Sequence, residues 1–122
     1  MSGALILFAH GARDPRWAEP LGRIQQLVAA RVAPGLQVHQ AFLELMSPSL
    51  TELIARLALQ QINDITVVPV FLGQGGHVRN DLPQLINELQ SLYSQIQFTL
   101  TPAIGEDPRV LDAIANACIQ HL

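Results

Sequence analysis

Apolar runs alternate with helix-like segments along the whole chain, and this alternation limits the possible folds more than any other feature. Residues 4–9 (ALILFA) and 65–72 (ITVVPVFL) are continuous apolar runs, as expected of parallel strands that are buried on both faces. Residues 36–45 and 96–101 contain alternating apolar and polar side chains, which favours strands nearer the edges of a sheet. The pattern predicts one α/β domain over residues 1–122, with a four-stranded, mostly parallel sheet and helices on both faces.

The helix-like segments begin at capping residues. Three of them follow an Asp or Ser that can cap a helix, with a proline suited to the first helical position next: Asp14-Pro15, Ser47-Pro48 and Asp107-Pro108. Asn80 is the candidate cap of the remaining helix. Pro20 lies beyond the first turn of a helix that begins at Pro15, so we expect this helix to start later or to bend.

Composition excludes several classes of partner. The net charge is −3 and there is no basic stripe, so we expect no nucleic acid partner. No apolar run approaches the roughly 18 residues of a membrane span, and the N-terminus lacks the features of a signal peptide. A lone cysteine, Cys118, agrees with a reducing compartment. We therefore expect a cytoplasmic protein that does not bind a membrane.

Potential metal ligands follow three of the predicted strands. His10 comes after the first strand, Glu44 lies at the end of the second, and His77 comes after the third. The carboxyl ends of parallel strands meet at one edge of the sheet, where such folds bind ligands. Two imidazoles and a carboxylate from separate loops are a ligand set expected for a divalent metal with open coordination positions. Each of these three residues could instead have a purely structural role. We expect His39 to be a solvent-facing strand residue and His121, in the last helical turn, to be structural.

A glycine-rich segment separates the third strand from His77. Gly73, Gly75 and Gly76 have no Cβ, so they can adopt positive φ or let a ligand approach the backbone closely. The segment is not a P-loop, because the Gly-Lys-Ser/Thr element is missing. Phosphoryl transfer with His10 as nucleophile stays open as an alternative, although Ala9 stands where histidine phosphatases usually have an arginine.

Three segments carry a resemblance to a known family: LILFAHGARDPRW, FLELMSPSL and VVPVFLGQGGHVRNDLP. In this order and spacing they resemble the small class II tetrapyrrole chelatases. These are the short-form sirohydrochlorin cobaltochelatases, which are related to the sirohydrochlorin ferrochelatases. The resemblance runs from Leu5 to the last helix, and the glycine-rich segment with its histidine is its most specific motif. One departure is Ala12, where the family commonly has a serine.

The resemblance implies an enzyme, a lyase that inserts a divalent metal into sirohydrochlorin in tetrapyrrole biosynthesis of the cobalamin or siroheme type. Co²⁺ is the expected metal, with Fe²⁺ or Ni²⁺ as close variants, and no organic cofactor is expected. His10 and His77 would be catalytic, and Glu44 would join them in binding the metal. Arg13 and Arg79 stand near these histidines and are candidates for holding substrate carboxylates.

The resemblance also bears on assembly. Gly75 and Gly76 would let the flat face of the macrocycle lie against backbone, but one sheet edge of this size covers only one face of such a ligand. Longer members of the family resemble two such units in one chain. We therefore expect a homodimer whose strand-end edges line a shared cavity. A non-catalytic carrier of metal or tetrapyrrole, using the same residues without turnover, is the other function to be weighed.

Overall fold

The sheet has its strands in the order β2-β1-β3-β4, and all neighbouring pairs are parallel. The computed structural model describes residues 2–122, except for the side chain of His77. Within that part of the chain the strands are β1 (Gly3–Ala9), β2 (Gln37–Phe42), β3 (Asp64–Pro69) and β4 (Gln97–Leu100). The helices are α1 (Glu19–Ala29), α2 (Leu50–Leu59), α3 (Gly76–Leu92) and α4 (Pro108–Ile119), with short 3-10 turns η1 (Pro15–Ala18) and η2 (Ile104–Glu106). The predicted α/β fold is confirmed, and the two alternating runs are the edge strands.

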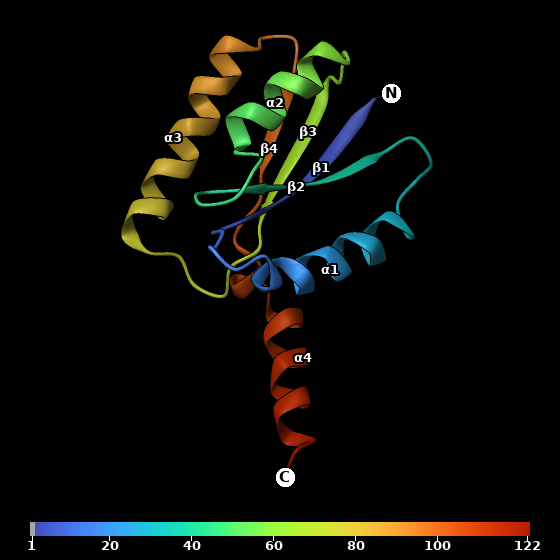
Figure 1. Cartoon of the computed structure of the whole chain (residues 1–122), viewed down its shortest axis with the longest axis vertical. Coiled ribbons are helices and arrows are strands. Elements are labelled where there is room, and N and C mark those ends of the chain that lie inside the picture. The colour runs from blue at the N-terminus through green and yellow to red at the C-terminus, as the bar shows by residue number, and fades with distance from the viewer. Residues whose placement is uncertain (1) are drawn as a thin grey trace.

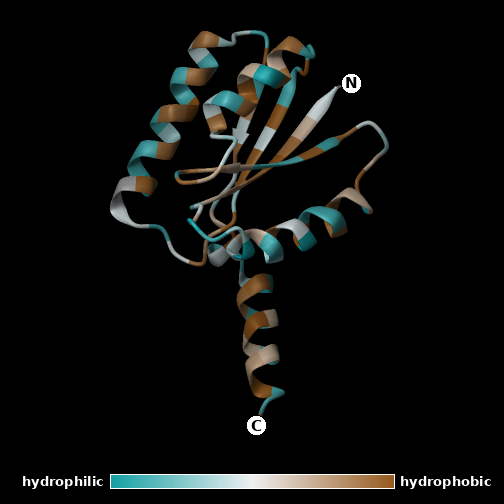
Figure 2. Ribbon diagram, viewed as in Figure 1, coloured by the Kyte–Doolittle hydropathy of each residue, from teal (hydrophilic) through white to brown (hydrophobic). Residues whose placement is uncertain are grey.

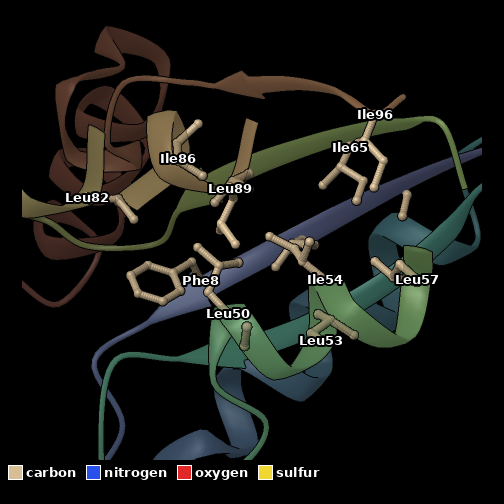
Figure 3. Packing of buried hydrophobic residues seen from close by; sticks show 14 of the residues in the cluster. Phe8, Leu50, Leu53, Ile54, Leu57, Ile65, Leu82, Ile86, Leu89 and Ile96 are labelled. Atoms are coloured by element: carbon tan, nitrogen blue, oxygen red, sulfur yellow. The ribbon is translucent and has the colours of Figure 1, made fainter. Parts of the chain in front are cut away.

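The larger core layer lies between the sheet and helices α2 and α3 (Figure 3). Ala4, Ile6 and Phe8 point to this face because side chains alternate along β1. The two helices contribute the following residues at helical spacing: Leu50, Leu53, Ile54, Leu57, Leu82, Ile86 and Leu89. Full burial of such a side chain stabilises the fold by about 1.5–3 kcal/mol. This layer therefore holds the ends of β1 and β3 in fixed positions.

The opposite face of the sheet carries a smaller core layer under α1. Leu7 and Phe42 pack there against Leu21 of α1. The Gln25 side-chain amide donates a 2.8 Å hydrogen bond to the carbonyl of Val38, which ties α1 to the edge strand β2. Figure 1 shows α1 along the sheet, whereas α4 points away from the rest of the molecule. The layer on this face therefore covers β1 and β2 but not β3 and β4.

Two predicted helix caps are wrong. Ser47 does not cap α2, because the carbonyl of Pro48 accepts a 2.9 Å hydrogen bond from the Phe42 N–H and keeps this segment extended. Ser49 is the cap, and it exchanges hydrogen bonds with Glu52 in a capping box. Asn80 does not cap α3. That helix begins earlier, after Gly75, whose missing side chain leaves no capping signal in the sequence.

The other two caps agree with the prediction. The carboxylate of Asp14 accepts a 2.9 Å hydrogen bond from the Arg16 N–H and caps η1. Helix α1 then follows η1, which places Pro20 in its first turn and explains the late start. The carboxylate of Asp107 accepts from the Arg109 N–H at 2.9 Å and caps α4. No helix within residues 2–122 is both long and apolar enough to cross a membrane.

Candidate functional site

His10 lies at the carboxyl end of β1, on the edge where the sequence predicts a site. Its imidazole packs on the ring of Phe71, with ring centroids 4.3 Å apart and planes inclined by 32°. Phe71 follows β3, is buried, and makes an edge-on contact of 5.9 Å with Phe8 in the core. Among the described residues, no hydrogen bond occupies the imidazole nitrogens of His10. The ring is therefore held by stacking, with its nitrogens left for a ligand or a proton.

Glu44 is joined to His10 through the backbone. The Glu44 N–H donates to the His10 carbonyl at 3.0 Å, and the Leu43 N–H donates to the Ala9 carbonyl at 2.8 Å. Gly11 makes this approach possible. Its φ is +93°, and a Cβ placed on it would lie 1.8 Å from the carbonyl oxygen of Glu44. The loops after β1 and β2 are thus locked together, with the exposed carboxylate of Glu44 two residues beyond the end of β2.

His77 lies in the first turn of α3, and its side chain is outside the described residues. Its segment nevertheless reaches the same edge. Val78 and Asp81 of α3 line an apolar pocket of about 220 Å³ together with Phe8 and Leu43, which places the start of α3 beside the loop that carries Glu44. Within the described side chains, no three His, Cys, Asp or Glu groups are close enough to hold a metal ion. The set of His10, Glu44 and His77 therefore stays a prediction.

The glycines before α3 do not use the conformational freedom that the sequence suggests. Gly73, Gly75 and Gly76 have no φ in the left-handed region, and a Cβ on any of them would meet no atom within 4 Å. The fold itself therefore does not require glycine at these positions. What the glycines provide is an open strip of backbone beside the edge, where a flat ligand can lie close to the chain.

The predicted substrate-binding arginines are exposed at this edge. Arg13 follows the turn after β1, and Arg79 lies in α3. In residues 2–122 the ion pairs join Arg16 to Asp14 and Arg109 to Asp107, each at 2.7 Å. Hydrogen bonds from Arg16 lower the pKa of Asp14. Arg13 and Arg79 are thus left without a carboxylate partner in the described structure, whereas Arg16 already has one.

The two remaining histidines lie elsewhere. His39 pairs with Ile6 within the β1–β2 ladder, and its Nε2 lies 2.7 Å from the Gln37 side-chain oxygen. It is half-buried rather than solvent-facing as predicted. Burial, with a smaller contribution from the charge of Arg56, lowers the pKa of His39. His121 follows the end of α4 and is exposed.

Sequence reasoning missed two contributors to the edge. The sequence pattern predicts that Phe71 is a strand residue, because it stands in an unbroken apolar run. Its stacking on His10 depends on where β3 ends. Gly11 follows His10 directly, and its need for positive φ shows only in three dimensions.

The edge also exposes apolar side chains in the loops after β2 and β3, with exposed fractions of 45% for Leu43, 60% for Leu45 and 67% for Leu72. Such a surface fits a flat, partly apolar ligand or a partner chain.

The fold and this edge define the class of the protein as a small chelatase-like α/β domain, and comparison with known proteins agrees. The CbiX family model matches residues 4–121, and the chain belongs to that family. A solved structure of a putative cobalamin (vitamin B12) biosynthesis CbiX protein from Marinobacter aquaeolei superposes with a TM-score of 0.84 at 31% identity. That alignment covers 98% of this chain and 96% of the other.

Relatives with assigned names point the same way. The chain is 27% identical to a sirohydrochlorin cobaltochelatase of Saccharolobus islandicus, over 92% of this chain and 90% of that protein. It is 28% identical to the protein of the same name from Methanococcus aeolicus, over 71% of this chain but only 60% of the relative. The cobalt complex of the sirohydrochlorin chelatase SirB from Bacillus subtilis superposes with a TM-score of 0.78 at 26% identity. The match covers 98% of this chain and 51% of SirB, so the chain spans about half of that protein.

Proposed function

We propose that this chain inserts a divalent metal, Co²⁺ in the first place, into sirohydrochlorin. The observation that carries the proposal is the locked pair of loops that presents His10 and Glu44 at one sheet edge, joined by the 3.0 Å hydrogen bond between their backbones. The two relatives named sirohydrochlorin cobaltochelatase support the same reaction. Fe²⁺ and Ni²⁺ are close variants, because ligand sets of this type accept several first-row metals.

The reaction requires the metal to exchange ligands and the macrocycle to release protons. A hydrated cation sheds water, and the neutral imidazoles of His10 and His77 with the carboxylate of Glu44 can take the place of that water. Two pyrrole protons leave the ring as the metal enters, so a base is needed on the metal's side. An imidazole suits this role because it ordinarily exchanges protons near neutral pH. Phe71 contributes by fixing the ring plane of His10, so that its nitrogens need not be ordered during the reaction.

Substrate binding uses charge and an open backbone. Arg13 and Arg79 are exposed and can donate to the peripheral carboxylates of sirohydrochlorin. Gly75 and Gly76 let the flat face of the macrocycle approach the chain, since nothing occupies the space around them. These contacts would hold the ring beside the metal ligands of the same edge, which removes part of the entropic barrier.

The working form is proposed to be a homodimer in which each copy supplies one edge. The chain matches half of SirB, so we take it to be one of the two units that the longer proteins contain. One edge carries ligands for only one face of a macrocycle, whereas binding sites usually enclose about 70–90% of a ligand's surface. A second copy would close the site by two-fold symmetry. The exposed, free Cys118 fits a reducing compartment, and we place the reaction in the cytoplasm.

Single substitutions at the edge test the proposal. His10→Ala and His77→Ala should each lower the rate of cobalt insertion, followed by the absorption spectrum of sirohydrochlorin, by about 100-fold or more. The matched control is His121→Ala, which changes an exposed histidine beyond α4 and should retain full activity. Circular dichroism should show the same fold in all three variants. Full activity in His10→Ala would remove that residue from the mechanism and contradict the proposal.

A further inference from the structure

Leu45, which directly follows the candidate metal ligand Glu44, has a backbone conformation that leucine rarely adopts. Its φ is +67°, in the left-handed region, where the Cβ of a side chain comes too close to the following carbonyl oxygen. Glycine and asparagine adopt this conformation far more readily. The side chain of Leu45 is mostly exposed, so it adds little to the core. The fold therefore gains little from leucine at this position.

The other non-glycine residue with a positive φ within residues 2–122 shows what is unusual about Leu45. Gln61 follows the end of α2 and has a φ of +62°. Helices commonly end on such a residue, and here the Ile62 N–H donates to the Leu57 carbonyl at 3.1 Å. No hydrogen bond between described residues involves the N–H or the carbonyl of Leu45. The end of a helix thus explains the conformation of Gln61 but not that of Leu45.

The neighbours of Leu45 in the loop after β2 are held in place on both sides. Before it, the Glu44 N–H donates to the His10 carbonyl at 3.0 Å. After it, the Pro48 carbonyl accepts a 2.9 Å hydrogen bond from the Phe42 N–H, so the chain has returned to the end of β2. The loop must reverse between these two bonds, and the positive φ of Leu45 lies within that reversal. The loop therefore presents the leucine side chain at a fixed place beside Glu44.

Two further leucines are exposed at the same sheet edge. Leu43 follows β2 and Leu72 follows β3, and these two strands flank β1 on either side. Figure 2 shows hydrophobic residues in the loop between β2 and α2. Two strand spacings, about 10 Å, separate β2 from β3, a width comparable with that of a tetrapyrrole macrocycle. We call Leu43, Leu45 and Leu72 the leucine rim, which stands on both sides of the loop that carries His10.

We infer that Leu45, with the rest of the leucine rim, contacts the flat face of the substrate and determines that a conjugated macrocycle is bound at this edge. The inference rests on the proposed function for the identity of that substrate. Sirohydrochlorin has acidic groups at its periphery and a flat conjugated ring, and the edge offers arginines for the former and leucines for the latter. Exposed leucines are ordinary on protein surfaces, but a leucine held in a strained conformation beside a ligand residue points to a contact with substrate.

Binding of metal-free sirohydrochlorin to Leu45→Asn tests the inference. Asparagine tolerates the left-handed conformation, so the melting temperature should equal or exceed that of the wild type. Equilibrium dialysis without oxygen should give a Kd about tenfold higher, as expected if the ring covers about half of the exposed leucine side chain. Leu45→Met keeps an apolar side chain and should bind as the wild type does. Leu59→Asn is the matched control, because this exposed leucine ends α2 shortly before β3 begins, far from the carboxyl ends of the strands.

The possible outcomes separate this inference from the proposed function. Wild-type affinity in Leu45→Asn would contradict the inference and leave the proposed function standing. Weaker binding in that variant, together with a wild type that binds sirohydrochlorin but inserts no cobalt, would contradict the function alone. A clear fall in the melting temperature of Leu45→Asn, or a smaller mass by light scattering, would assign Leu45 to the fold or to a contact between copies and contradict the inference. A wild type that binds no sirohydrochlorin would contradict both.

Discussion

The imidazole of His10 packs on the ring of Phe71 at a tilt, with ring centroids 4.3 Å apart and ring planes inclined by 32°. Phe71 belongs to the core through its contact with Phe8, and its carbonyl accepts a 2.8 Å hydrogen bond from the N–H of Gly105, in the η2 turn that precedes α4. One aromatic residue therefore connects the candidate metal ligand, the interior of the domain and the helix that leaves it.

Phe71→Leu tests whether this stacking positions His10. The substitution keeps an apolar side chain in the core, so it should cost less stability than the roughly 3–5 kcal/mol typical of Phe→Ala. Without an aromatic face beside it, His10 gains freedom, and the cobalt insertion rate should fall about tenfold or more. Phe98→Leu, on β4, is the matched control and should leave the rate unchanged. Equal rates in the two variants would assign Phe71 a purely structural role.

Gly11→Ala tests the lock between the first two loops. The added Cβ would collide with the Glu44 carbonyl, and the residue would have to keep φ at +93°, so the loops must separate. Cobalt insertion should drop by at least tenfold, and the melting temperature should fall as well. Gly35→Ala provides the comparison, because it also has a positive φ, +92°, but open space around it. If Gly11→Ala lowered the melting temperature no more than Gly35→Ala and kept full activity, the lock would have no importance for the site.

Arg13→Gln and Arg79→Gln test the binding of substrate carboxylates. Each exposed charge pair is worth about 1 kcal/mol at most, so each substitution should raise KM for sirohydrochlorin by up to about fivefold, with little effect on kcat. High salt should reduce the difference from the wild type. Arg16→Gln is the control, because the Arg16 side chain is already paired with Asp14. A KM change confined to Arg16→Gln would contradict this assignment.

His39 makes stability depend on pH. Burial lowers the pKa of His39 in the folded protein below its ordinary value of 6.5, so the unfolded chain binds its proton more readily. Above the pKa that His39 has in the unfolded chain, its full contribution to the free energy of unfolding is present. That contribution is lost as the pH falls from this value through the lower pKa of His39 in the folded protein. Chemical denaturation should thus show a loss of stability on acidification that His39→Gln reduces. An identical pH dependence in wild type and variant would contradict the role of His39.

Much of the fold could be predicted because strand and helix periods are local properties. The buried runs around Leu7 and Val67 and the edge strand at Phe98 follow from the side-chain pattern. The start of α3 could not be predicted, because Gly75 caps it without a side chain and Asn80 offers a stronger signal within the helix. The direction of α4 could not be predicted either. An amphipathic pattern indicates that one face of a helix packs against another element, but it does not show which element that is.

Part of the candidate site could also be predicted from the sequence. The carboxyl ends of parallel strands meet at one edge, so the placement of His10 and of the loop with Glu44 follows from topology. The stacking of Phe71 on His10 and the approach of Glu44 to Gly11 depend on where each strand stops. Strand ends are set by contacts between loops, and these contacts leave little pattern in a single sequence.

Multiple turnover with cobalt is the most direct test of the central claim. Purified protein is mixed with a large excess of sirohydrochlorin and Co²⁺ without oxygen, and the absorption spectrum of the tetrapyrrole is followed, with the uncatalysed rate subtracted. The account predicts cobalt-sirohydrochlorin in amounts many times the protein concentration, with an initial rate proportional to protein. A change that stops at one product per site, or that proceeds no faster than without protein, would contradict catalysis and leave a carrier of metal or tetrapyrrole.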